Sequence, residues 1–372
     1  MKPRVQSVDA LRGLIMIVMA LDHVRDFFHW QATKFQPDDL TRTTAALFLT
    51  RWITHFCAPV FVFTAGLSAY FPLSRGRSKA EVSRFLWTRG LWLVFLELTV
   101  VHFGLLLAEA SGLVLLEVIW ALGVSMIVLA GLIHVPVRWL APLSLAVIGL
   151  HNLADPITAS GLWNILHRQG AFPLGPLTVF AAYPLVPWFA VMAAGYCFGH
   201  FFEFDEPKRR RLFTRIGLGL TAGFVALRTL NIYGNPTPWD GSALSFLNCA
   251  KYPPSLDFLL MTLGPAILLL SRLENPPAVL LTYGRVPLFY FVVHLYLIQA
   301  LAKAAVAMQL GRTGLLFDFS KSMASPSRPA GYGFDLWAVY LIWIGIAAAL
   351  YPLCHWFGAL KQRRTDWWLS YL

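Results

Sequence analysis

The sequence predicts an all-α membrane protein: one domain (residues 1–372) built as a bundle of about ten transmembrane helices, with both termini in the cytoplasm. Two observations predict this class. Hydrophobic residues make up 57% of the chain and charged residues only 13%, whereas soluble domains average about 25% charged residues. The basic residues also gather in short clusters between apolar runs. This pattern is typical of membrane topology signals rather than of nucleic-acid binding.

Ten apolar segments are long enough to cross a membrane, because a helix needs roughly 20 apolar residues to span the hydrocarbon core. The chain shows no internal repeat, which weighs against a transporter built from two related halves. Three loops rich in Pro and Gly, at 154–176, 231–254 and 311–333, are too long for simple turns, and we expect them to cover an external opening. The predicted spans are residues 8–29, 46–71, 85–107, 113–134, 137–153, 176–202, 212–229, 256–272, 280–308 and 334–358.

The distribution of basic residues orients the chain. With a cytoplasmic N-terminus, most Lys and Arg residues fall on the cytoplasmic side, as membrane insertion favours. The first segment has the basic start of a secretory signal peptide, but no small-residue cleavage site follows it, so we predict an uncleaved helix. The cytoplasmic set is Lys2, Arg4, Arg12, Arg75, Arg77, Lys79, Arg84, Arg138, Lys208, Arg209, Arg210, Arg211, Arg215, Arg272, Arg285, Lys361, Arg363 and Arg364.

A cluster of ionisable residues ends the first apolar segment. The stretch LIMIVMALDHVRDFFHW carries Asp22, His23, Arg25, Asp26 and His29, although a charge that faces lipid is costly. Residues at i, i+4 and i+7 share one face of a helix, so Asp22, Asp26 and His29 form a stripe of carboxylates and imidazole. A carboxylate beside an imidazole fixes its tautomer and raises its basicity, as a general base or an acyl-accepting nucleophile requires.

Two other interpretations of this cluster stay open. The same residues fit a solvated helix end, with Arg25 paired to Asp22. A metal site is the weaker alternative, because Arg25 opposes a bound cation. The four cysteines lack the paired spacing of a metal knuckle or a disulfide framework. We therefore expect no metal cofactor.

Further polar residues lie within other predicted spans, and we expect them to converge on an interior cavity because lipid exposure would be costly. Arg51 and His55 have i, i+4 spacing in the second span, and His294 lies in the ninth. A single His in such a run is also typical of a packing residue bonded to a backbone carbonyl. Lys251, in the loop stretch NCAKYPPSL, either holds a cation over an external site or begins a rigid loop. Gly66 is typical of close helix packing.

Several stretches carry a resemblance to a known family. RVQSVDALRGLIMIVMALDHVRDFFH and FCAPVFVFTAGLSAY resemble the DUF1624 family of bacterial membrane proteins, which is similar to the catalytic region of heparan-alpha-glucosaminide N-acetyltransferase. TRWITHFCAPVFVF, KYPPSLDFLLMTLGP and GRVPLFYFVVHLYLI also look like recurring blocks of the bacterial proteins. The resemblance implies a transmembrane acyltransferase of the bacterial inner membrane that uses acetyl-CoA from the cytoplasm. It also implies a reactive histidine after the first helix, and DFFH assigns this role to His29 before His23.

We therefore expect an acyltransferase that moves an acetyl group from acyl-CoA to an extracytoplasmic acceptor, an amino sugar or other glycan. Asp22 or Asp26 would orient the reactive imidazole of His29 or His23. The expected partners are membrane lipid, acyl-CoA and the acceptor, without nucleic acid; assembly into a homo-oligomer stays open. The alternatives are a transporter or flippase with a polar intramembrane relay and a non-catalytic membrane protein. The residues expected to bind substrate are Arg25, Arg51, His55, Lys251 and His294.

Overall fold

The structure is a computed structural model of the chain, and it describes residues 5–32, 34–106, 112–311, 316, 329–364 and 366–371. The chain is mostly helical, as predicted. Lys2 and Arg4 of the predicted cytoplasmic set lie outside the described residues, as does much of the predicted loop 311–333.

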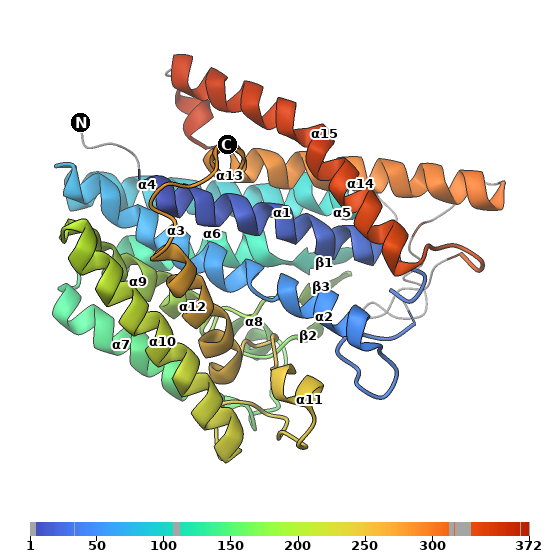
Figure 1. Ribbon diagram of the computed structural model, residues 1–372, viewed down its shortest axis with the longest axis horizontal. Helices are drawn as coiled ribbons and strands as arrows, with labels where there is room; N and C mark the ends of the chain where they lie inside the picture. Colours follow the sequence, from blue (N-terminus) through green and yellow to red (C-terminus); the bar gives the residue numbers. More distant parts are fainter. Residues whose placement is uncertain are drawn as a thin grey trace.

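The helices and strands follow one another in a single series (Figure 1). In chain order they are α1 Gln6–Phe28, α2 Ala45–Thr54, α3 Cys57–Ser74, α4 Lys79–Leu96, the π-helical turn η1 Glu97–Val101, α5 His102–Leu106, β1 Leu113–Leu116, α6 Val118–Leu132, α7 Val137–Leu150, the 3-10 turn η2 His151–Ala154, α8 Leu162–Leu166, β2 Gly170–Leu174, β3 Leu177–Ala181, α9 Trp188–Phe198, the 3-10 turn η3 Gly199–Glu203, α10 Glu206–Leu230, α11 Ala243–Leu247, α12 Leu256–Leu270, α13 Ala278–Arg285, α14 Pro287–Leu310, α15 Leu336–Arg363 and the 3-10 turn η4 Trp367–Ser370.

Within the described residues, five helical stretches are long and apolar enough to cross a membrane. The α6 and α12 helices are also apolar but shorter. The α1 helix has 23 residues, yet its charged side chains keep it out of this set. The ten-span map and the cytoplasmic termini therefore stay predictions. The five stretches are Ala45–Ser74, Lys79–Leu105, Val137–Ala154, Pro287–Leu310 and Leu336–Arg363.

The prediction of an all-α fold is wrong in one region, because the chain also contains a three-stranded sheet with the order β1-β3-β2. Leu113 to Leu116 of β1 pair in parallel with Thr178 to Ala181 of β3, and β2 pairs with β3 antiparallel. The predicted spans 113–134 and 176–202 thus each begin with a strand, and the helices that follow are short. Short apolar runs such as LVLL are compatible with a strand as well as with a helix. Here the pairing with β3 makes the run a strand.

The α1 helix runs through the centre of the bundle and packs against α13, α14, α15, α3 and α2 (Figure 1). Its closest approach is to α13. A Cβ atom added to Gly13 would lie 1.8 Å from the carbonyl oxygen of Leu280, and one added to Gly284 would lie 1.7 Å from that of Asp9. Only glycine allows two helix backbones to come this close, so these residues fix where α1 crosses α13.

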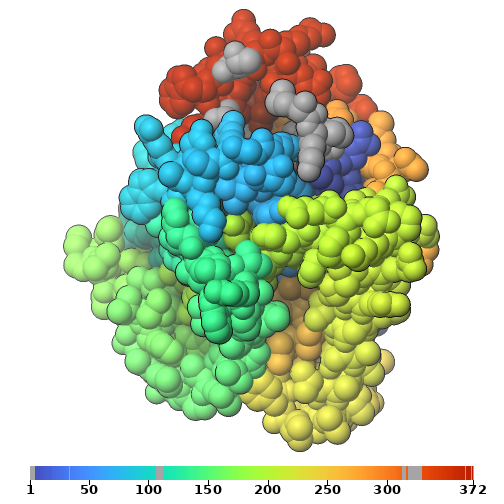
Figure 2. Space-filling view, turned by 90° about the vertical axis from the view of Figure 1, so that its left-hand side faces the viewer, coloured from blue at the N-terminus to red at the C-terminus, as the bar shows by residue number. Residues whose placement is uncertain are grey.

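One end of the molecule is basic, and Figure 2 views the molecule from that side. The turn between α3 and α4 carries exposed Arg75 and Arg77, and α10 begins nearby with a run of Lys and Arg residues. An ion pair of 3.0 Å between Arg209 and Glu274 joins the start of α10 to the segment after α12. Several turns of the predicted cytoplasmic set therefore lie at the same end of the bundle.

Candidate functional site

The carboxylate of Asp22, near the end of α1, is held by three side chains. Arg25 lies one turn further along α1, with its Nη1 atom 2.8 Å from Oδ1 of Asp22. Arg51 reaches across from α2 and places its Nη1 atom 2.5 Å from Oδ2. The hydroxyl of Thr54 also donates to Oδ1, at 2.8 Å. Charged groups that are buried must be paired, and this network joins α1 to α2.

The predicted stripe of Asp22, Asp26 and His29 is only partly present. Asp26 lies on α1 and accepts a hydrogen bond of 2.6 Å from Nη2 of Arg25. The helix ends at Phe28, however, and the backbone of His29 is extended. His29 instead forms a β-bridge with Phe334. The sequence pattern assumed one more helical residue than this pairing allows.

His23 and His294 form a hydrogen-bonded pair that joins α1 to α14. Nδ1 of His23 lies 2.8 Å from Nε2 of His294, and Nδ1 of His294 lies 2.9 Å from the carbonyl oxygen of Tyr290. A carbonyl only accepts, so Nδ1 of His294 carries a proton and, in the neutral ring, Nε2 accepts. We assign the Nδ1 proton of His23 from this network. The Nε2 atom of neutral His23 then keeps its lone pair.

Two further predicted residues, His55 and Lys251, lie near Asp22. His55 follows the end of α2 and is 1% exposed, and within the described part of the chain neither of its ring nitrogens has a hydrogen-bond partner. The ammonium group of Lys251 lies 5.0 Å from the ring centre of Tyr252 and 5.8 Å from that of Tyr183. The charge of Lys251 acts on both Asp22 and His55.

The structure brings together polar side chains from four separate parts of the chain, but the roles predicted for them stay predictions. In one respect it differs from our expectation: the hydrogen bond that orients His23 is accepted by another imidazole, that of His294, rather than by a carboxylate. Sequence reasoning missed Thr54 and Tyr183. Thr54 could have been predicted from its spacing, because it is a polar residue three positions after Arg51 in the same helix. No pattern in the sequence distinguishes Tyr183. The residues brought together are Asp22, His23, Arg25, Asp26, Arg51, His55, Lys251 and His294.

This arrangement suits chemistry in which a proton moves and negative charge develops. An imidazole nitrogen with a fixed lone pair can take a proton. Fixed cationic side chains in a low-dielectric surrounding stabilise a developing oxyanion without reorganising. The fold and the site thus define an integral membrane protein with a buried polar centre between α1, α2 and α14.

Comparison with known families identifies this class further. The family model described as "Heparan-alpha-glucosaminide N-acetyltransferase, catalytic" matches residues 4–234. This match covers more than half of the 372 residues, and the chain belongs to this family. A search of curated proteins found no match. Family membership makes the chain a transmembrane enzyme of the acetyltransferase type. The matched region contains His23, His29 and Arg51, whereas Lys251 and His294 lie outside it.

Proposed function

We propose that this protein transfers an acetyl group from acetyl-CoA to an extracytoplasmic glycan, such as an amino sugar, and that His23 is the reactive imidazole. The hydrogen bond between His23 and His294 carries this proposal. It fixes the tautomer of His23 and leaves Nε2 as the basic atom. His29 has the closer family motif but a different structural position, beyond the end of α1.

In the proposed reaction, the amine or hydroxyl of the acceptor attacks the thioester carbonyl, and its proton passes to Nε2 of His23. The new bond joins the acetyl carbon to the acceptor. The bond between that carbon and sulfur breaks, and the thiolate leaves with the proton that His23 returns. Asp22 adjoins His23 in α1 and Asp26 lies one turn beyond Asp22, and we assign to these carboxylates the counter-charge of the transient imidazolium. Arg51 and Lys251 are the cations that would stabilise the oxyanion.

The basic end of the bundle supports delivery of the donor from the cytoplasm. The start of α10 exposes Arg210, Arg211 and Arg215 on its surface, beside Glu206, and guanidinium groups bind phosphate oxygens well. We infer that the phosphates of acetyl-CoA bind at this end of the molecule. By the predicted topology this end faces the cytoplasm of a bacterial cell.

The test is acetyl transfer by the purified protein in lipid nanodiscs, with radiolabelled acetyl-CoA and a panel of amino sugars. We expect labelled acceptor and released CoA thiol in equal amounts. His23→Ala should lower the rate by at least about 100-fold, since a positioned general base contributes that much or more. His29→Ala should keep the rate within a few-fold of wild type.

The opposite pattern, with activity lost in His29→Ala and kept in His23→Ala, would transfer the reactive role to His29. The exposed His355 supplies a matched control, and His355→Ala should behave like the wild type. The rival function is transport or flipping of a sugar-linked or lipid-linked substrate. Substrate that crosses the membrane of proteoliposomes without cleavage of acetyl-CoA would favour that function over ours.

A further inference from the structure

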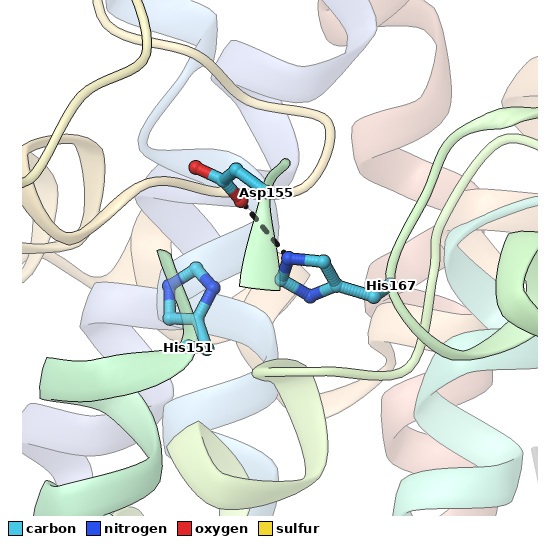
Figure 3. Close-up of side chains that lie close together, drawn as sticks. All are labelled: His151, Asp155 and His167. Carbon is cyan, nitrogen blue, oxygen red and sulfur yellow. Dashed lines mark hydrogen bonds and ion pairs between the residues drawn. The ribbon is translucent and has the colours of Figure 1, made fainter. Parts of the chain in front are cut away.

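A second group of polar side chains lies outside the charged cluster. It is formed by residues directly after α7 and directly after α8. His151 starts the η2 turn, Asp155 follows it, and His167 directly follows α8. One ligand atom from each residue lies within 4.8 Å of the other two. Figure 3 shows the two imidazole rings and the carboxylate gathered around one point. Two imidazoles and one carboxylate are a ligand set that divalent zinc prefers.

Buried ring nitrogens that have no hydrogen-bond partner within the described chain favour the presence of a ligand at this site. His151 is 6% exposed, and within the described chain neither of its ring nitrogens has a hydrogen-bond partner. Nε2 of His167 lies 2.9 Å from Oδ1 of Asp155. Buried polar groups are nearly always satisfied, so a group that the protein atoms do not supply is expected at this point.

The surrounding residues hold the carboxylate in place, as outer-shell partners of metal ligands do. The amide of Asn152 donates to Oδ2 of Asp155 at 2.9 Å, which leaves Oδ1 for a metal. The amide oxygen of Asn152 accepts from the backbone N–H of Leu256 and so ties the group to the start of α12.

The three ligand atoms lie within 4.8 Å of one another, so they must close by as much as about 1.4 Å to hold one tetrahedral ion. Two ligands at roughly 2.1 Å from a tetrahedral zinc lie about 3.4 Å apart, and Nε2 of His167 and Oδ1 of Asp155 are already 2.9 Å apart. On binding, the proton shared between these two atoms is lost and both atoms become ligands. The fourth position of a tetrahedral ion would be left to water.

We propose that His151, Asp155 and His167 bind one divalent zinc ion, which fastens the segment after α7 to the end of α8. Backbone bonds continue from there toward the charged cluster: the N–H groups of Leu185 and Val186 donate to the carbonyls of Ile165 and Leu166. Tyr183, whose ring lies near Lys251, is two residues before Leu185. The ion therefore stabilises the segment that carries Tyr183.

The test is metal binding by the full-length protein, purified with a tag that contains no histidine and treated with chelator. Addition of Zn²⁺ should give one tightly bound ion per chain by elemental analysis and should raise the Tm. Co²⁺ should give the visible absorption of a tetrahedral site. His151→Ala and His167→Ala should each weaken Zn²⁺ binding by more than about 100-fold, and Asn152→Ala by about 10-fold, the range for outer-shell partners.

Two further variants keep the test decisive if an alanine variant folds poorly. His167→Cys retains a metal ligand and should add a thiolate-to-cobalt charge-transfer band, which only direct coordination produces. His134→Ala changes an exposed histidine and should bind Zn²⁺ like the wild type. Zinc binding that is unchanged in His151→Ala and His167→Ala, or absent from the wild type, would overturn the proposal. Both results are independent of acetyl transfer.

Discussion

At the scale of single residues, the pairing of His23 with His294 has a direct kinetic consequence. His294 does not carry the proposed proton itself; it positions His23 through one hydrogen bond of 2.8 Å. His294→Gln removes the imidazole acceptor and frees His23 to adopt the other tautomer. We expect kcat to fall about 10- to 100-fold, part of what a general base contributes, with the KM for acetyl-CoA near its wild-type value.

A double variant separates this positioning role from a merely structural one. Groups that act as a unit give non-additive losses. His294→Gln should therefore cost little further activity when it is added to His23→Ala. Losses that simply multiply in the double variant would show that His294 acts independently of His23.

The ion pair between Asp22 and Arg51 supports a prediction about stability. Asp22→Asn leaves both Arg25 and Arg51 without their full counter-charge in a largely buried place. Breaking a buried ion pair by removing one partner costs roughly 3–5 kcal/mol, so we expect a clearly lower Tm by tryptophan fluorescence. Asp22→Asn combined with Arg51→Gln should recover part of this loss, because no lone charge from that pair remains.

An exposed pair provides the comparison. Arg364 and Asp366 lie 4.0 Å apart, with side chains 66% and 44% exposed. Solvent screens such pairs, which contribute only about 0–1 kcal/mol. Arg364→Gln should leave the Tm nearly unchanged, and a similar drop in both variants would mean that burial does not distinguish the two pairs.

At the scale of secondary-structure elements, glycines set the crossing of α3 with α9. A Cβ atom at Gly66 would lie 1.8 Å from the carbonyl oxygen of Met192, and one at Gly195 would lie 2.1 Å from that of Phe63. The prediction that Gly66 allows close helix packing is thus confirmed. Gly66→Ala must push the two helices apart, and overpacking of this kind costs typically about 1–3 kcal/mol.

Gly219 is the matched control, since it lies within α10 with nothing within 4 Å of an added Cβ atom. Gly219→Ala should leave the Tm unchanged or raise it, because alanine favours a helix over glycine by roughly 0.5–1 kcal/mol. Thermal unfolding in one detergent measures both variants. An equal or larger loss in Gly219→Ala would contradict the packing argument.

At the scale of the whole molecule, the basic end predicts the orientation of the chain. Phosphatase and fluorescent-protein fusions after Asp205 and at the C-terminus should both report the cytoplasm, because clusters of Lys and Arg are retained on that side. A fusion within the loop at Gly241 should report the exterior. An external signal after Asp205 or at the C-terminus would overturn the map, with the short predicted span 137–153 as the first place to revise.

Much of the helical framework was predictable from sequence because apolar runs and basic clusters are properties of single segments. The predicted spans 46–71 and 334–358 correspond closely to the stretches Ala45–Ser74 and Leu336–Arg363. The predicted spans 113–134 and 176–202 do not correspond to single helices, since residues at their starts pair with each other as strands. The candidate site was predictable as a set of residue types, because ionisable side chains in apolar segments must face the interior.

The sequence by itself determined that this chain is a helical membrane protein and which ionisable residues needed partners. Only the tertiary structure decided which residues serve as those partners. His23 meets His294, distant in sequence, α1 stops at Phe28 because the next residues pair with Phe334, and His167 returns to His151 and Asp155. The reason is physical: hydropathy and helical period depend on neighbouring residues, whereas a hydrogen bond or a metal site depends on the packing that brings remote segments within 3 or 4 Å.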